Sequence, residues 1–138
     1  IYSMSDTKHY IPMPEIPGEK DFNPYYMMLK MDINKPLYIC NHILCIVNYQ
    51  QDGMTSRVLQ SYEECPVSYA MLREAYLEHQ EIPCMFAYRQ CIHYVSSWIF
   101  AKRQKKKVNS LWRRKLVWMA VIPGVILNMW VCWKNRRH

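Results

Sequence analysis

An uncharged run of eighteen residues, Leu116 to Trp133, constrains the fold of this chain more than any other feature. Within the run only Pro123, Gly124 and Asn128 are not apolar. A helix of this length is about 27 Å long, at ~1.5 Å per residue, which is close to the ~30 Å hydrocarbon thickness of a bilayer. The run therefore predicts one transmembrane helix over residues 116–133.

Tryptophans near both ends of the run support the same prediction, because such rings anchor membrane helices at the interfaces. The expected interface anchors are Trp112, Trp118, Trp130 and Trp133. Pro123 and Gly124 predict a kink in the helix, and proline costs a helix in water roughly 3 kcal/mol. Neighbouring helices can compensate for such a kink in a membrane. A buried core helix is the alternative interpretation of the run.

Acidic and basic residues are separated along the chain. All eleven Asp and Glu lie between Asp6 and Glu81, whereas the chain from residue 82 onward holds twelve Lys and Arg, and the net charge is +7. The basic half cannot neutralise itself, so it needs lipid or RNA phosphates, acidic protein or water. Eight bases in the segment 102–115 are predicted to bind lipid phosphates at headgroup level: Lys102, Arg103, Lys105, Lys106, Lys107, Arg113, Arg114 and Lys115.

The segments before the uncharged run have different compositions. Residues 1–36 contain five prolines and predict an extended arm laid against a partner, with a free terminus as the alternative. Residues 37–83 form a small acidic region. In it, apolar residues 37–49 and 55–62 around Asp52–Gly53 predict a β-hairpin, although a buried helix would show a similar pattern. Cys65–Pro66 then predicts a helix start.

Residues 84–101 predict an amphipathic helix, because the polar side chains of Arg89, His93 and Ser96 share one face. A second membrane span over this segment is the alternative. With the basic interfacial segment 102–115, the span 116–133 and the basic tail 134–138, the expected fold class is a mainly α membrane protein. It has an extended N-terminal arm, a small mixed α/β or helical region, an amphipathic helix and one C-terminal transmembrane helix.

No motif in the sequence predicts catalysis, a metal or a cofactor. The six cysteines lack the paired spacing of zinc sites, so buried thiols are expected, with one disulfide or a metal site as alternatives. The chain lacks a phosphate-binding glycine loop and the common hydrolase and metalloprotease motifs. We therefore expect a protein that is not an enzyme and has no cofactor.

Two functions from different classes fit these observations. The first is a non-catalytic accessory subunit of a multisubunit membrane complex, most reasonably one of the mitochondrial inner membrane, of respiratory-chain or ATP-synthase type. Its partners would be other subunits and anionic lipid such as cardiolipin, and its location integral to the membrane. The alternative is an organellar RNA-binding structural protein, such as a mitochondrial ribosomal protein, in which the bases bind phosphates and tryptophans stack on nucleobases.

Overall fold

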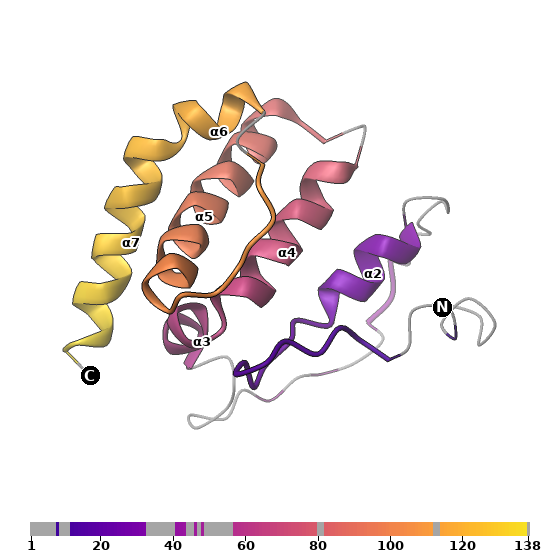
Figure 1. Cartoon of the computed structure of the whole chain (residues 1–138). Coiled ribbons are helices and arrows are strands. Elements are labelled where there is room, and N and C mark those ends of the chain that lie inside the picture. Colours follow the sequence, from indigo (N-terminus) through magenta and orange to yellow (C-terminus); the bar gives the residue numbers. More distant parts are fainter. Residues whose placement is uncertain are drawn as a thin grey trace.

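The computed structural model describes residues 8, 12–32, 41–43, 46, 48, 57–79, 82–111 and 114–137. These residues are mainly helical, and none of them belongs to a strand (Figure 1). The helices are α2 (Tyr25–Asp32), α3 (Val58–Glu64), α4 (Pro66–Glu78), α5 (Cys84–Arg103), α6 (Lys115–Met119) and α7 (Val121–Asn135).

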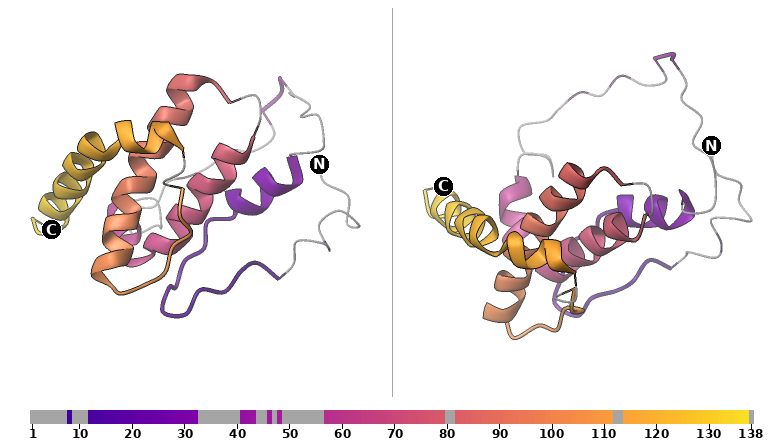
Figure 2. Two further views of the ribbon diagram at one scale, coloured as in Figure 1. Left: turned by 45° about the horizontal axis from the view of Figure 1, so that its top comes forward. Right: turned by 90° about the horizontal axis from the view of Figure 1, so that it is seen from above.

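Helix α5 lies at the centre of the molecule. Helix α4 packs against one side of it and α7 against the other, while α2 lies outside α4 and α3 contacts α4, α5 and α7 (Figure 1). Helix α4 runs antiparallel to α5, but α7 runs in the same direction as α5 (Figures 1 and 2). This parallel arrangement requires a return connection, in which residues 104–111 run back along the bundle.

The larger of the two core clusters combines one large aromatic residue with smaller ones, which lets the helices approach closely. Tyr94 of α5 is fully buried, and its hydroxyl donates to the carbonyl of Asn109 and accepts from the backbone N–H of Leu111 at 3.2 Å. The return connection is thus held against α5 by a core side chain. The buried residues of this cluster are Ala70, Leu77, Ala87, Cys91, Tyr94, Val95, Val117 and Ala120.

The end of α5 is closed by a Schellman motif. The N–H of Lys106 donates to the carbonyl of Ala101 at 2.8 Å, and the N–H of Lys105 donates to the carbonyl of Lys102 at 3.1 Å. Lys105 has a φ of 58°, the left-handed conformation that this motif requires and that glycine usually occupies. The motif turns the chain sharply from α5 into the return connection.

The predicted membrane span is wrong. The uncharged run is divided at Ala120 between α6 and α7, and no helix among the described residues combines the length and apolarity needed to cross a bilayer. Helix α7 has 15 residues, about 22 Å at ~1.5 Å per residue. Pro123 explains the break, because its ring lacks the N–H that would donate to Met119 and clashes with that carbonyl. The predicted integral membrane location is overturned by the same finding.

The predicted β-hairpin is also wrong where the structure describes it. Residues 58–62, expected in its second strand, lie in α3. Tyr62 is buried there and packs edge-on against Tyr69 and Phe100. These tertiary contacts outweigh the weak strand preference of the segment. The first predicted strand, 37–49, falls largely outside the described residues.

The two helices predicted from sequence after Cys65 are present. Helix α4 starts with Pro66 at its first position, as the Cys65–Pro66 pair predicts. The helix predicted over 84–101 extends from Cys84 to Arg103. It buries polar side chains among its apolar ones, which reflects its central position: Gln90, Ser96 and Ser97.

Candidate docking surface on α6 and α7

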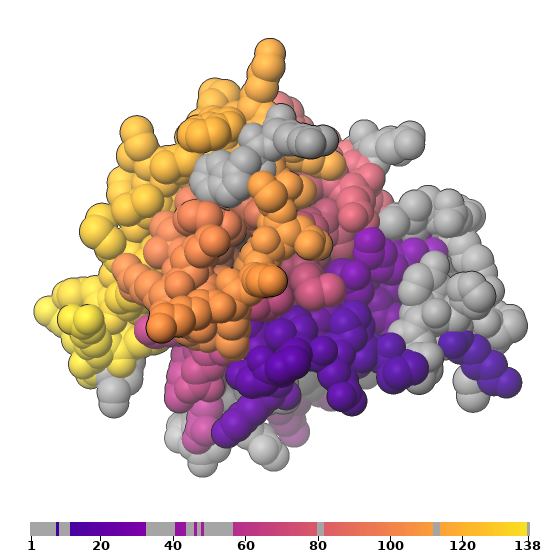
Figure 3. Space-filling model, viewed as in Figure 1, coloured from indigo at the N-terminus to yellow at the C-terminus, as the bar shows by residue number. Residues whose placement is uncertain are grey.

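Helices α6 and α7 lie along one edge of the molecule (Figures 1 and 3). They expose an apolar stripe. Ile122, Ile126 and Met129 recur at helical spacing and are 75%, 56% and 56% exposed. We call this stripe the outer face. Its members are Trp118, Met119, Ile122, Val125, Ile126, Met129, Trp130 and Trp133.

The opposite side of α7, which packs on the protein, buries Gly124, Asn128 and Val131. Gly124 lies against α5 so closely that a Cβ there would be 2.6 Å from the Cβ of Val95. Asn128 is buried, and its side-chain amide donates to the carbonyl of Ser96 at 3.2 Å. Helix α7 therefore buries an amide and a glycine beside Val131, while most of its larger apolar side chains face outward. A surface helix in water normally has the reverse arrangement.

Basic side chains lie at both ends of the outer face. Lys115 is exposed at the start of α6, and Arg136 and Arg137 are exposed after α7. The guanidinium of Arg137 stacks on Trp133, 3.9 Å from the ring centroid. Since the sequence has no Asp or Glu after Glu81, neither end of the face is neutralised from within α5–α7.

The predicted lipid-phosphate residues fall into two groups. Lys106 and Arg114 bind other groups of the protein: Lys106 pairs with Glu19 at 3.1 Å, and Arg114, although exposed, donates to the carbonyl of Leu77 at 2.7 Å. Arg103 donates to the thiol of Cys132 at 3.1 Å while remaining exposed. The others that the structure describes are exposed: Lys102, Lys105, Lys107 and Lys115.

The predicted interface anchors and kink residues lie on two sides of α6 and α7. Trp118, Trp130 and Trp133 belong to the outer face, whereas Gly124 faces α5. Pro123 is the third residue of α7, so the interruption falls at Ala120, before the proline. Trp112 and Arg113 lie outside the described residues.

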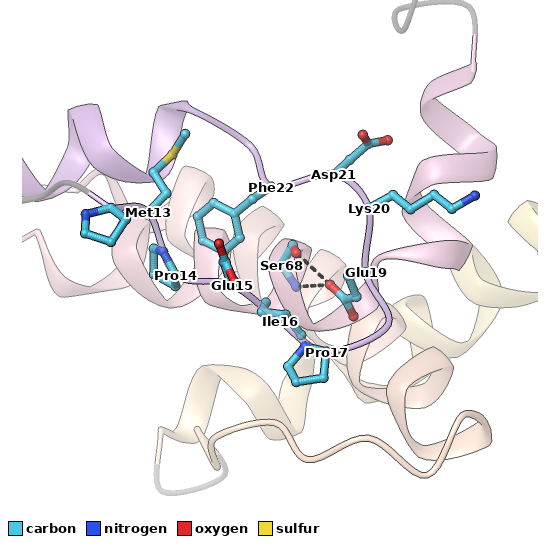
Figure 4. Close-up of a pocket in the computed structure, with 11 residues that line it drawn as sticks. Met13, Pro14, Glu15, Ile16, Pro17, Glu19, Lys20, Asp21, Phe22 and Ser68 are labelled. Carbon is cyan, nitrogen blue, oxygen red and sulfur yellow. Dashed lines mark hydrogen bonds between the residues drawn. The ribbon is translucent and has the colours of Figure 1, made fainter.

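The N-terminal arm forms a second candidate site. Residues 12–17 and 19–22 of the arm line a cavity of about 550 Å³ with Ser68 of α4 (Figure 4). Glu19 is nearly fully buried there. Its carboxylate accepts from the N–H groups of Val67 and Ser68 at 2.9 and 2.8 Å and from the Ser68 hydroxyl at 2.6 Å. With Lys106 as a further donor, this carboxylate caps α4, and we assign the junction a structural role.

Sequence reasoning missed Glu19 because its targets are remote. The Val67 N–H that it caps is 48 residues away, and Lys106 is 87 residues away. The usual capping signal is a residue immediately before the helix, and Cys65 supplies no side-chain hydrogen bond here. No local pattern in the sequence identifies Glu19 as the residue that caps α4.

A buried polar cluster between α3, α4 and α5 is the third candidate. The Tyr62 hydroxyl donates to the carbonyl of His93 at 2.7 Å, and Arg73 donates to the side-chain oxygen of Gln90 at 3.1 Å. Burial, with smaller contributions from Arg73 and Arg89, lowers the pKa of His93 to about 4. His93 is therefore neutral near pH 7 and poorly suited to act as a base there.

Metal ligands are not assembled in the part of the chain that the structure describes, where no three His, Cys, Asp or Glu side chains come together. Cys65, Cys84, Cys91 and Cys132 are free thiols. Comparison of the chain with protein families, with characterised proteins and with solved structures finds no match. The exposed side chains of the molecule are therefore the evidence that bears on its function.

Proposed function

We propose that this protein is an accessory protein that attaches to an anionic membrane surface, with α7 lying in the plane of the interface. The membrane contact is the outer face of α6 and α7. Interfacial helices of this kind place apolar side chains about 5–10 Å into the headgroup and acyl boundary and keep bases beside the phosphates. The proposal does not require any helix to cross the bilayer.

The outward orientation of the apolar side chains carries the proposal. Asn128 and Gly124 occupy the protected side of α7, while Ile122 and Ile126 face outward. Exposing such a stripe to water is unfavourable, and moving one large apolar side chain out of water contributes roughly 1.5–3 kcal/mol when burial is complete. A contiguous apolar face of this kind marks an interaction site.

The placement of charge favours an anionic bilayer as the occupant. Lys115 lies at one end of the stripe, and Arg136 and Arg137 lie at the other. Each base near an anionic surface contributes about 1 kcal/mol. Tryptophan prefers the interface between headgroups and acyl chains, and Trp118, Trp130 and Trp133 all lie on the outer face.

The cellular setting stays a prediction. The sequence favours a multisubunit complex of the mitochondrial inner membrane, whose other subunits would contact the remaining surface. The expected anionic lipid is then cardiolipin. The proposed attachment through α7 does not depend on this setting, because phosphatidylserine offers the same phosphate chemistry.

Vesicle flotation of the full chain tests the proposal. We expect binding to phosphatidylcholine vesicles that contain cardiolipin or phosphatidylserine, weaker binding to pure phosphatidylcholine, and weaker binding at high salt. The double variant Ile122→Ser with Ile126→Ser should lose most of this binding. The matched control is Ile43→Ser with Ile46→Ser, since these isoleucines are 89% and 88% exposed but lie outside the outer face.

If the outer face binds RNA or a second copy of the chain and not a membrane, the binding experiments give different results. Salt-sensitive RNA binding without vesicle binding would replace the proposal by the RNA-binding alternative. Sedimentation showing a dimer that Ile122→Ser with Ile126→Ser dissociates, again without vesicle binding, would identify a second copy of the chain as the occupant. Equal vesicle binding by the two double variants would also contradict the proposal.

A further inference from the structure

We propose that the membrane contact continues from α7 onto the first turn of α5, and that this end of the molecule inserts deepest. The inference rests on the proposed function and adds that α7 is tilted relative to the membrane plane. The surface concerned, which we call the corner, consists of Met85, Trp118, Met119 and Ile122.

The backbone arrangement brings Met85 to the corner. Met85, Tyr88 and Ile92 are spaced at i, i+3 and i+7, so they lie along one side of α5. Tyr88 donates its hydroxyl hydrogen bond to the carbonyl of Met119, and the Ile92 carbonyl lies 3.1 Å from an ideal Cβ at Gly124. This side of α5 therefore faces α6 and α7, and Met85 continues it by one turn beyond the contact with Tyr88.

The corner side chains are more exposed than those at the C-terminal end of α7. Met85 and Ile122 are 78% and 75% exposed, whereas Trp130 and Trp133 are 47% and 49% exposed. The four corner residues are thus more exposed than any other large apolar side chains on α5–α7 that the structure describes. A bilayer approached by this surface meets the corner first.

The positions of the basic side chains at the two ends of this surface support the same tilt. Lys134, Arg136 and Arg137 follow one another closely at the C-terminal end of α7, and Arg137 stacks on Trp133. A base covering that ring holds it at the level of the phosphates, since bases stay at the headgroups. At the corner, Lys115 is exposed at the start of α6, so it can reach the headgroups while the methionines and Ile122 enter.

Depth-dependent quenching of tryptophan fluorescence tests the tilt. Two full-length variants keep only Trp118 or only Trp133, with phenylalanine at the other tryptophan positions, and are bound to cardiolipin-containing vesicles whose lipids carry bromine at defined acyl positions. We expect stronger quenching and a larger blue shift for Trp118. Equal or stronger quenching of Trp133 overturns the inference.

A second variant pair tests the contribution of α5. Met85→Ser should weaken vesicle binding about five- to tenfold, because a methionine leaves the contact. The control Met28→Ser removes an exposed methionine of α2, outside the corner, and should change binding less than about twofold. An effect of Met85→Ser no larger than that of Met28→Ser overturns the inference.

The two proposals can fail separately. If the native chain does not bind vesicles, the proposed function fails as well. If the native chain binds vesicles without the tilt, only the inference fails.

Discussion

The hydroxyl of Tyr88 donates a hydrogen bond to the carbonyl oxygen of Met119, 3.3 Å away, and this is the acceptor that Pro123 leaves without a helical donor. A side chain of α5 thereby stabilises the break between α6 and α7. Tyr88→Phe should lower the free energy of unfolding by about 1 kcal/mol, because this acceptor loses its partner. Urea denaturation measures the change.

Pro123→Ala gives this prediction its control. Alanine supplies the missing N–H to Met119, so Tyr88→Phe should cost little in the Pro123→Ala background. A double-mutant cycle measures the coupling between the two positions. Additive effects would show that the Tyr88 hydroxyl does not compensate for the proline.

Gly124→Ala should destabilise the protein although alanine is the better helix former. The added Cβ would lie 2.6 Å from the Cβ of Val95 and 3.1 Å from the carbonyl of Ile92, and neither atom is at a flexible chain end. Overpacking costs typically 1–3 kcal/mol, against a gain in helix propensity of about 1 kcal/mol.

Thermal unfolding tests the Gly124→Ala prediction. The net effect should be a lower Tm, and Val95→Ala should remove part of it in the double variant because it deletes the colliding methyl groups. A Tm that rises for Gly124→Ala alone would mean that α5 and α7 are farther apart than the structure places them.

Glu19→Ala should release the N-terminal arm and destabilise α4. The buried carboxylate accepts from two backbone N–H groups, and Lys106 loses its partner when the carboxylate is removed. The expected loss is on the order of 2–3 kcal/mol, since hydrogen bonds to charged groups contribute about 1.5–3 kcal/mol. Hydrogen exchange should show faster exchange at Val67 and Ser68.

Glu15→Ala is the matched control for Glu19, because Glu15 is an exposed glutamate of the same arm. It should leave both stability and exchange at α4 nearly unchanged. Similar effects of the two variants would argue that the arm is held by its apolar residues and not by the Glu19 carboxylate.

Stability should fall as the pH drops from about 6.5 to about 4. Burial lowers the pKa of His93 to about 4, so the unfolded chain binds a proton on this side chain over a range in which the folded chain does not. The stabilisation is therefore fully present above pH 6.5 and decreases below it. His93→Gln should flatten this part of the pH profile by on the order of 2 kcal/mol. An unchanged slope would show that other groups control it.

Local sequence patterns correctly predicted helices α4 and α5, whose signals lie within the helices themselves. Pro66 predicts the start of α4, and the spacing of Arg89, His93 and Ser96 predicts one long helix in the middle of the chain. The apolar run containing Ile122 and Ile126 predicted a transmembrane helix, and the structure instead divides this run between α6 and α7.

The wrong predictions share a physical cause, which is that tertiary contacts decide them. The effect of Pro123 could be anticipated as a kink, but Tyr88 favours a full break by binding the Met119 carbonyl. Helix α3 forms where a strand was expected because Tyr62 fits against Phe100. Such partners are distant in sequence, and a single sequence does not reveal them.

The junction of Glu19, α4 and Lys106 has a consequence for the order in which the chain can fold during synthesis. Glu19 leaves the ribosome first, its backbone donors on α4 follow 48 residues later, and Lys106 follows 87 residues after Glu19. At about 5–20 residues per second, the nascent carboxylate waits roughly 4–17 seconds for its cation. Val67 precedes Lys106 by 39 residues (87 − 48), so for roughly 2–8 seconds the arm can contact α4 without the cation that completes the burial of Glu19. The junction is incomplete, and open to proteases and chaperones, during that time.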